Sequence, residues 1–434
     1  MMHVYKGCLM SLFSKNPALQ TLFSDHIGAL AQSEGLAPEN IRRDIERGTM
    51  VLLGNPSHPN VRPILVGQPS RVKINANIGT SPMASSPEEE IEKLAAALTV
   101  GADTVMDLSI AGDLNAIRIA MLAACPAPLG TVPMYAVAQR YISAGKDPAL
   151  FSPEELFEEI ERQAEQGVDF MTVHCGLTAR GAAWATEEQG RAMGIVSRGG
   201  SILARWMRTH KKENPLLEEY DRILELARKY NVTLSLGDGL RPGAGCDAGD
   251  PAQWEEVITL GRLARQGLAQ GVQCMVEGPG HVPMHLVEAQ IRGIKTATYG
   301  APLYVLGPLV IDSCPGYDHI AGAIGGAIGV RAGVDFLCYL TPAEHLTLPD
   351  KKDVVAGVIA SRIAAQAGEV ALGTKAALAR EQAMSEARKA LDWKGMKQAA
   401  LDPAMVCARR EAHEGEEVCA MCGEFCAVKM LRTE

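Results

Sequence analysis

Three cysteines near the end of the chain have the spacing of metal ligands. Cys419, Cys422 and Cys426, hereafter the tail cysteines, are separated by two and then three residues. Three thiolates can hold three irons of a 4Fe–4S cluster and leave the fourth iron open. S-adenosylmethionine needs such an open iron for reductive cleavage to a 5′-deoxyadenosyl radical. The alternative is a structural zinc ion, for which Cys407 or His413 could supply a fourth ligand.

Two histidines form a second candidate metal site. His281 belongs to the glycine-rich turn Glu277-Gly278-Pro279-Gly280-His281, and His345 follows a later apolar run. Two histidines at one end of a barrel can share a divalent ion, zinc or iron, with water completing its shell. Alternatively, both could be helix-start histidines hydrogen-bonded to the backbone. The pair is called the paired histidines below.

Nearly all of the remaining apolar runs also end in polar residues. In a barrel, the catalytic residues lie at the carboxyl ends of the parallel strands. Each could instead be a capped turn or a satisfied buried polar group. The candidates are Asn75, Asn77, Asp107, Ser109, Tyr135, His174, Ser197, Arg198, Asp238, Arg241, Tyr304, Asp312, Asp318 and Glu344.

The elements that must position these residues read as strands alternating with helices. Nine aliphatic runs are predicted as strands, at residues 72–79, 104–109, 128–135, 169–175, 194–198, 232–238, 272–277, 303–308 and 334–341. Continuous apolar strands between helices indicate a parallel sheet covered on both faces. The pattern predicts an α/β fold, a (β/α)₈ barrel, and one of the nine runs must lie outside it.

Three helix starts combine a capping residue, a proline and then Glu or Gln, as a capping box does; they begin at Ser86, Ser152 and Asp250. Strands stop near residue 370, and the chain turns helical before the tail cysteines. We therefore expect a small N-terminal region (1–70), a barrel with the substrate and metal site (71–370), and a helical tail carrying the cluster (371–434).

Composition narrows the classes of function. The net charge is −9 and no basic stripe is present, so nucleic-acid binding gets no support. No apolar run approaches the roughly 20 residues of a membrane span. Because Met1 to Lys6 lack a charged region followed by an apolar core and a cleavage site, a signal peptide is not expected. A cytoplasmic protein is expected. Single cysteines in apolar runs, namely Cys125, Cys175, Cys274 and Cys338, are expected to be reduced and buried.

Taken together, these motifs resemble the phosphomethylpyrimidine synthase family in its short form, the radical enzymes of thiamine pyrimidine formation. The resemblance runs from about Val72 to Cys426. The matching stretches are Asn77–Gly79, Thr104–Ser109, Gly130–Pro133, Ile195–Gly200, Ser235–Gly243, Glu277–Pro283, Pro315–His319 and Cys338–Pro342.

This resemblance implies a substrate, aminoimidazole ribotide, and residues that bind it. Those positions are Asn77, Met106, Tyr135, His174, Ser197, Arg198, Gly199, Asp238, Gly239, Leu240, Arg241, Glu277 and Tyr304. It also implies S-adenosylmethionine, an electron donor, a divalent metal on the paired histidines and a 4Fe–4S cluster on the tail cysteines. A homodimer is implied, in which a mobile tail brings the cluster to the barrel mouth. Arg198 and Arg241 are donors suited to a phosphate.

Three stretches depart from the family pattern. Asp-Leu-Ser-Thr-Gly becomes Asp107–Ala111, Asp-Ile-Ala-Pro-Gly becomes Asp312–Gly316, and Asp-His-Ile-Thr-Ser becomes Asp318–Gly322. If these changes lie at strand ends facing the substrate, they should redirect a radical cascade rather than abolish binding. The sequence therefore favours the paralogous 5-hydroxybenzimidazole synthase, which uses the same ribotide to make the lower-ligand base of cobalamin. The thiamine pyrimidine synthase itself is the alternative.

Two further classes stay open at this point. In a zinc-dependent barrel hydrolase, the paired histidines would hold the active metal and Glu277 would be the base. A non-catalytic metal-binding protein would carry the same ligands without turnover.

Overall fold

Eight short, mostly buried strands close into a parallel barrel, which confirms the predicted fold class. The computed structural model describes residues 11–188 and 190–430. The barrel strands are β3 (Lys73–Ile78), β4 (Thr104–Asp107), β5 (Leu129–Thr131), β6 (Phe170–Val173), β7 (Thr233–Leu236), β8 (Cys274–Gly278), β9 (Leu303–Leu306) and β10 (Phe336–Cys338). Closure comes from β10, which pairs with β9 on one side and with β3 on the other.

One of the nine predicted runs had to lie outside the barrel, and it is the run at residues 194–198. The prediction that this run is a strand is wrong. Gly194 turns the backbone with a φ of 62°, and Ser197 then caps helix α9 (Arg198–His210) by accepting a hydrogen bond from the Gly200 N–H. A short β-branched run looks the same in a loop as in a strand. Here Val196 packs against Gly243 instead of against a neighbouring strand.

Helices cover the barrel, and the three whose starts were predicted begin at Ser86, Ser152 and Asp250 as expected. The covering helices are α4 (Pro87–Thr99), α5 (Leu114–Ala124), α6 (Pro133–Ser143), α7 (Pro153–Glu165), α8 (Ala179–Ala183), α9, α10 (Pro215–Glu218), α11 (Tyr220–Tyr230), α12 (Pro251–Ala269), α13 (Met284–Ala297), α14 (Asp318–Ala332) and α15 (Lys351–Leu372). Ser86 and Ser152 form complete capping boxes. Asp250 caps α12, but Gln253 accepts the return bond from Gly249.

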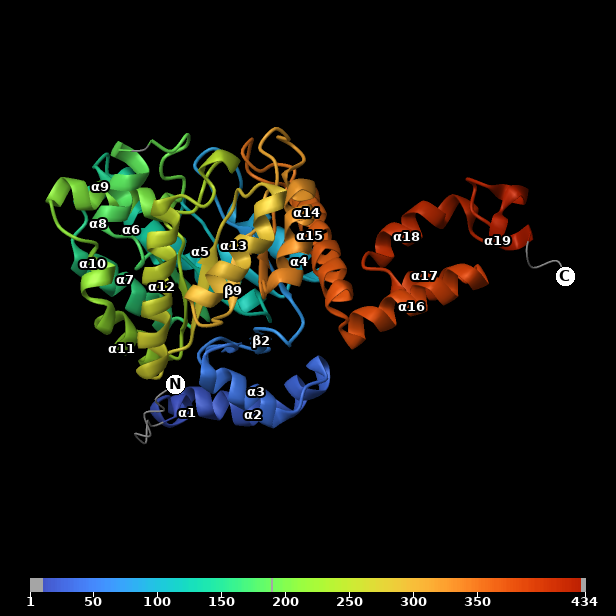
Figure 1. The fold of residues 1–434 in the computed structure, drawn as a ribbon, viewed down its shortest axis with the longest axis horizontal. Helices are drawn as coiled ribbons and strands as arrows, with labels where there is room; N and C mark the ends of the chain where they lie inside the picture. The colour runs from blue at the N-terminus through green and yellow to red at the C-terminus, as the bar shows by residue number, and fades with distance from the viewer. Residues whose placement is uncertain (1–10, 189, 431–434) are drawn as a thin grey trace. The chain divides into compact units, whose positions relative to one another are not determined.

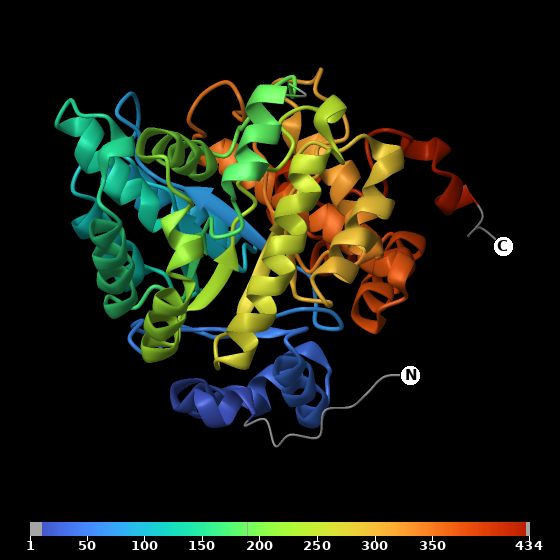
Figure 2. The same ribbon diagram turned by 60° about the vertical axis from the view of Figure 1, so that its left-hand side comes forward.

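The residues before β3 close the amino-terminal end of the barrel. They form α1 (Leu12–Lys15), α2 (Pro17–Glu34), α3 (Pro38–Arg47) and the antiparallel pair β1 (Val51–Leu53) and β2 (Ile64–Val66), a pair that the sequence did not indicate. Figures 1 and 2 both show these helices past one end of the barrel, with β2 between.

Polar residues just before three barrel strands hold the backbone of this closing segment. Asp169 accepts from the N–H of Asn55, Gln273 from Leu52 and Asp335 from Gln68, each at 2.7 Å. Asp169 also pairs with buried His58, whose other ring nitrogen faces two carbonyl oxygens.

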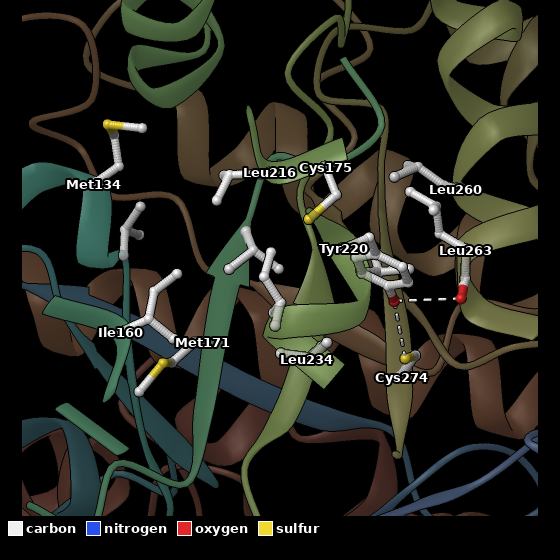
Figure 3. Packing of buried hydrophobic residues seen from close by; sticks show 14 of the residues in the cluster. Met134, Ile160, Met171, Cys175, Leu216, Tyr220, Leu234, Leu260, Leu263 and Cys274 are labelled. Carbon is white, nitrogen blue, oxygen red and sulfur yellow. Dashed lines mark hydrogen bonds between the residues drawn. The ribbon is translucent and has the colours of Figure 1, made fainter. Parts of the chain in front are cut away.

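Aliphatic and sulfur-containing side chains pack between the strands and their helices (Figure 3). Tyr220 on α11 donates its hydroxyl hydrogen to the Leu263 carbonyl at 3.2 Å, and the hydroxyl oxygen lies 3.7 Å from the Cys274 sulfur. Cys125, Cys175 and Cys274 are free and buried as predicted, and burial raises the pKa of the Cys274 thiol to about 12.

By packing, the chain divides into Met1–Ala365 and Gln366–Glu434. Helices α16 (Lys375–Ala390), α17 (Trp393–Ala399), α18 (Pro403–Arg410) and α19 (Ala427–Met430) make the second unit helical. Among described helices, α15 alone is long and apolar enough to cross a membrane, contrary to the expectation that no segment is. A single helix that meets a criterion of length and composition alone is weak evidence for a span, because core helices of soluble proteins meet it too.

Candidate functional site

A cavity of about 100 Å³ opens at the carboxyl ends of the barrel strands. Eight predicted substrate-binding residues line it: Asn77, Met106, Tyr135, His174, Asp238, Arg241, Glu277 and Tyr304. Because these residues come from seven different βα units, with Asp238 and Arg241 sharing one, the barrel alone brings them together. The structure brings these eight residues to one cavity, and their binding of the ribotide stays a prediction.

Two carboxylates and one guanidinium make up the charged part of this cavity. The Arg241 Nη1 donates to the Asp238 Oδ1 at 3.0 Å, and Glu277 Oε1 accepts from the hydroxyls of Thr172 and Ser235, both at 2.7 Å. Burial raises the pKa of Asp238 to about 8, with Arg241 lowering it and Glu277 raising it. Burial also raises the pKa of Glu277, and the two hydroxyls act against that rise. The pair can therefore hold a proton near neutral pH.

His174 forms the neutral side of the cavity. Burial, and then the charge of Arg241, lowers the pKa of His174 to about 3, so its ring is uncharged at neutral pH. The Ser197 hydroxyl lies 3.1 Å from His174 Nε2, and a side chain at Gly199 would overlap the ring. Glycine at position 199 therefore lets α9 begin directly against His174.

Amide and sulfur groups complete the cavity on the opposite strands. Asn75 Nδ2 donates to the Tyr304 hydroxyl at 2.8 Å, and Asn77 Nδ2 lies 3.0 Å from the Cys338 sulfur. Tyr304 in turn points its hydroxyl at the Met106 sulfur, 3.6 Å away. Cys338 is buried as expected, but it is part of the cavity wall and not only of the core.

Five predicted ribotide positions do not line this cavity. Arg198 lies with its guanidinium carbon 4.8 Å from the centre of the Tyr135 ring and lines a neighbouring cavity of about 290 Å³. Ser197 and Gly199 lie behind His174 at the start of α9. Gly239 and Leu240 form the buried turn between Asp238 and Arg241, where the Leu240 N–H donates to Glu256 at 2.7 Å. These four residues therefore support the side chains that form the cavity wall.

Sequence reasoning missed the residues that support the named ones. Thr172 and Ser235 lie inside strands, not at their ends, so the strand-end rule passed over them. Glu256 sits within helix α12 and is almost wholly buried; its Oε1 has no partner in the described part of the chain. The inward face of alternate strand residues could have indicated Thr172 and Ser235.

The paired histidines lie side by side, with ring centres 5.4 Å apart. His281 Nδ1 is 2.7 Å from Asp312 Oδ1, and His345 Nδ1 is 3.0 Å from Asp318 Oδ1. The backbone interpretation of these rings is therefore wrong, since carboxylates hold both. Metal-binding histidines are commonly oriented this way, with the other ring nitrogen left for the metal.

His345 has a φ of 60°, an uncommon conformation for a side-chain-bearing residue, and such conformations cluster at functional sites. No group of three Cys, His, Asp or Glu side chains that could hold a metal ion is found in residues 11–188 and 190–430. The two neighbouring imidazoles, each held at Nδ1 by a carboxylate, fit a divalent ion in their chemistry.

The tail cysteines lie in a series of tight turns between α18 and α19. Backbone N–H groups of Cys422 and Met421 lower the pKa of the Cys419 thiol, which favours the thiolate that iron requires. Arg410 fixes the preceding segment by donating to the carbonyls of His413 and Glu416, while its guanidinium carbon lies 3.8 Å from the centre of the Trp393 ring. The donor set fits an iron–sulfur cluster in its chemistry, while the three thiols of the described tail are not gathered around one point in this structure.

The departures from the family pattern do not all face the site. Ile110 lines the neighbouring cavity together with Asn77, and Cys314 is partly exposed between β9 and α14. Ala321 and Gly322 are buried within α14, where a side chain at 322 would overlap Leu340. The expectation that these two residues face the substrate at a strand end is wrong, because they serve helix packing.

Known proteins similar to this chain include several that share about half of its residues. A relative from Methanopyrus kandleri named phosphomethylpyrimidine synthase is 50% identical over 414 residues, covering 94% of this chain and 96% of its own. One of the same name from Desulfotalea psychrophila is 48% identical over 403 residues, covering 92% and 93%. Dihydropteroate synthase from Thermus thermophilus matches in structure with 15% identity and a TM-score of 0.40, covering 74% of this chain and 99% of its own. The Radical SAM ThiC family matches residues 15–433, and the chain belongs to that family.

Proposed function

We propose that the chain converts aminoimidazole ribotide to the phosphorylated hydroxymethylpyrimidine of thiamine synthesis. The observation that carries this proposal is the cavity, in which eight of the family's ribotide-binding positions meet at the barrel mouth. Relatives that carry the pyrimidine name at 48–50% identity support this product over the benzimidazole that the sequence favoured.

The residues divide the work of holding the ribotide. Arg198, Arg241 and the N–H groups at the start of α9 offer donors for the phosphate, as helix starts commonly do. Neutral His174 can accept or donate one hydrogen bond without repelling these cations. Asp238 and Glu277 can take up or release a proton at the aminoimidazole, because both pKa values lie above the ordinary range.

Membership of a radical S-adenosylmethionine family implies an iron–sulfur cluster and S-adenosylmethionine. When bound to the tail cysteines, the cluster would supply the electron that starts radical chemistry. An external electron donor would return an electron to the cluster. The barrel's share is to hold the substrate out of water while reactive species persist. Family membership favours this enzyme over a zinc-dependent hydrolase or a non-catalytic protein. The homodimer and the cytoplasmic location stay predictions.

A second candidate product is 5-hydroxybenzimidazole, and one observation favours it. Ile110 replaces a hydroxyl-bearing threonine of the family pattern and lines the neighbouring cavity, which shares Asn77 with the substrate cavity. An apolar group there removes a hydrogen bond that a radical intermediate could use, and small changes of this kind alter which product is released.

Product identification after anaerobic incubation with ribotide, S-adenosylmethionine and reductant tests the proposal. A phosphorylated pyrimidine as the main product supports it, as does growth rescue of a thiamine-pyrimidine auxotroph. Release of unphosphorylated benzimidazole contradicts it and favours the second candidate. Ile110→Thr should then shift the product toward the pyrimidine, whereas the matched change Ala321→Thr, inside α14, should not.

A further inference from the structure

Arg191 is a buried guanidinium outside the substrate cavity, in the loop between α8 and α9. Its side chain is only 2% exposed. It donates to both oxygens of Asp250, at 2.6 and 2.7 Å, and to the backbone carbonyls of Leu240 at 2.6 Å and Arg241 at 3.2 Å. Surface ion pairs contribute little, but a forked guanidinium that satisfies a carboxylate and two carbonyls fixes geometry.

A second set of contacts joins the same two loops. The Asp247 carboxylate accepts from the backbone N–H of Ala192 at 2.8 Å and of Met193 at 3.1 Å. Residues 191–193 are thus bound to residues 247–250 by a side-chain fork and two backbone donors. These contacts are called the latch below.

The latch joins the two segments that offer phosphate donors. Residues 191–193 lie shortly before Gly194 and Ser197, and Ser197 caps the start of α9. Arg191 also donates to backbone carbonyls of the turn that presents Arg241. The two segments also touch directly, because a Cβ at Gly200 would lie 2.5 Å from the Gly239 carbonyl oxygen. The latch therefore sets the spacing between the helix start and the Arg241 turn.

We propose that Arg191 is a positioning residue for recognition of the substrate's phosphate group. It is not among the residues that line the cavity; instead it holds the Arg241 turn beside the loop that leads into α9, so that donors from both segments can reach one phosphate. This inference rests on the proposed function, because the ribotide supplies the phosphate.

Binding of the ribotide and of the unphosphorylated riboside, measured by calorimetry, separates this role from a general structural one. Arg191→Lys keeps the charge but loses the fork. Asp250→Asn removes the carboxylate and keeps an N-cap residue on α12, so this variant should fold. Arg205→Lys on α9, where the arginine pairs with Asp147 at the surface, is the matched control.

Both latch variants should bind the ribotide about tenfold or more weakly, leave riboside binding unchanged, and raise KM with little change in kcat. The control should match the wild type. Equal weakening of both ligands, or unchanged ribotide binding by folded latch variants, would overturn the inference. It is also overturned if the wild-type chain binds the ribotide no more tightly than the riboside, whereas failure to bind either ligand overturns the proposed function itself.

Discussion

Replacing Thr172 by valine should cost more stability at high pH than at low pH. The Thr172 hydroxyl donates to Glu277 Oε1 at 2.7 Å in a buried site. Valine has nearly the same shape but no donor, so the ionised carboxylate loses one of two hydroxyl partners. A bond to a charged acceptor contributes about 1.5–3 kcal/mol, against about 0.5–1.5 kcal/mol for a neutral one.

The difference between those ranges, about 1–1.5 kcal/mol, is the pH-dependent part of the loss. It corresponds to a further rise of about one unit in the pKa of Glu277. Burial already raises that pKa in the folded state above 4.5, so ionisation of this group lowers stability as pH rises. The additional loss caused by Thr172→Val should be absent below the folded pKa that Glu277 has in the wild type. It should grow above that pKa and level off once the pH exceeds the higher pKa that Glu277 acquires when the threonine is replaced.

Denaturant unfolding of wild type and variant between about pH 5 and about pH 9 measures this difference directly. Thr104→Val is the matched control, because Thr104 is also a buried strand residue whose hydroxyl donates at 2.7 Å, but to the neutral Asn75 amide. Its loss should not vary with pH. A loss in the free energy of unfolding that does not vary with pH for Thr172→Val would refute the inference that the Thr172 hydroxyl stabilises ionised Glu277. An equal pH dependence of the loss in both variants would refute it too.

Three more outcomes follow from the site. Changing any one tail cysteine to alanine should abolish 5′-deoxyadenosine formation while leaving the barrel's unfolding transition in place, because the tail packs as a separate unit; normal cleavage in two of the three variants contradicts this. Alanine at both paired histidines should remove one equivalent of non-cluster metal, measured by elemental analysis, and full retention counts against the site. Gly199→Ala places a methyl group 2.2 Å from the His174 ring, so ribotide affinity should fall about tenfold or more; unchanged affinity in calorimetry would show that the ring can move freely.

Much of the fold could be predicted because strand and helix signals are local. Ser86 and Ser152 are capping residues that each stand three positions before a glutamate, a pattern that predicts a helix start. The structure shows both hydrogen bonds of each capping box. The strand prediction for the run around Val196 was wrong because it too relied on a local signal. The composition of this run suits a strand, but the turn at Gly194 takes it out of the sheet.

The site was predictable as far as its residues end strands. His174 and Glu277 follow that rule, whereas Thr172 and Ser235 act from within strands and Arg191 acts through backbone carbonyls. Such supports depend on which loops meet in space. A single sequence does not encode that meeting in any short pattern.

The closing segment beneath the barrel has a consequence for protein engineering. Asp169 and Asp335 precede their strands, are almost wholly buried, and bind the backbone of residues 55 and 68. Deleting the first 70 residues would remove the His58 ring and the two backbone N–H donors from these carboxylates and would uncover this end of the barrel to water. Asp169 would keep the N–H of Leu129, and Asp335 would keep Leu303 and Lys295, so each carboxylate would lose part of its hydrogen bonds, at a cost in stability. A barrel that is grafted into another protein must therefore keep this closing segment together with the end that carries the substrate cavity.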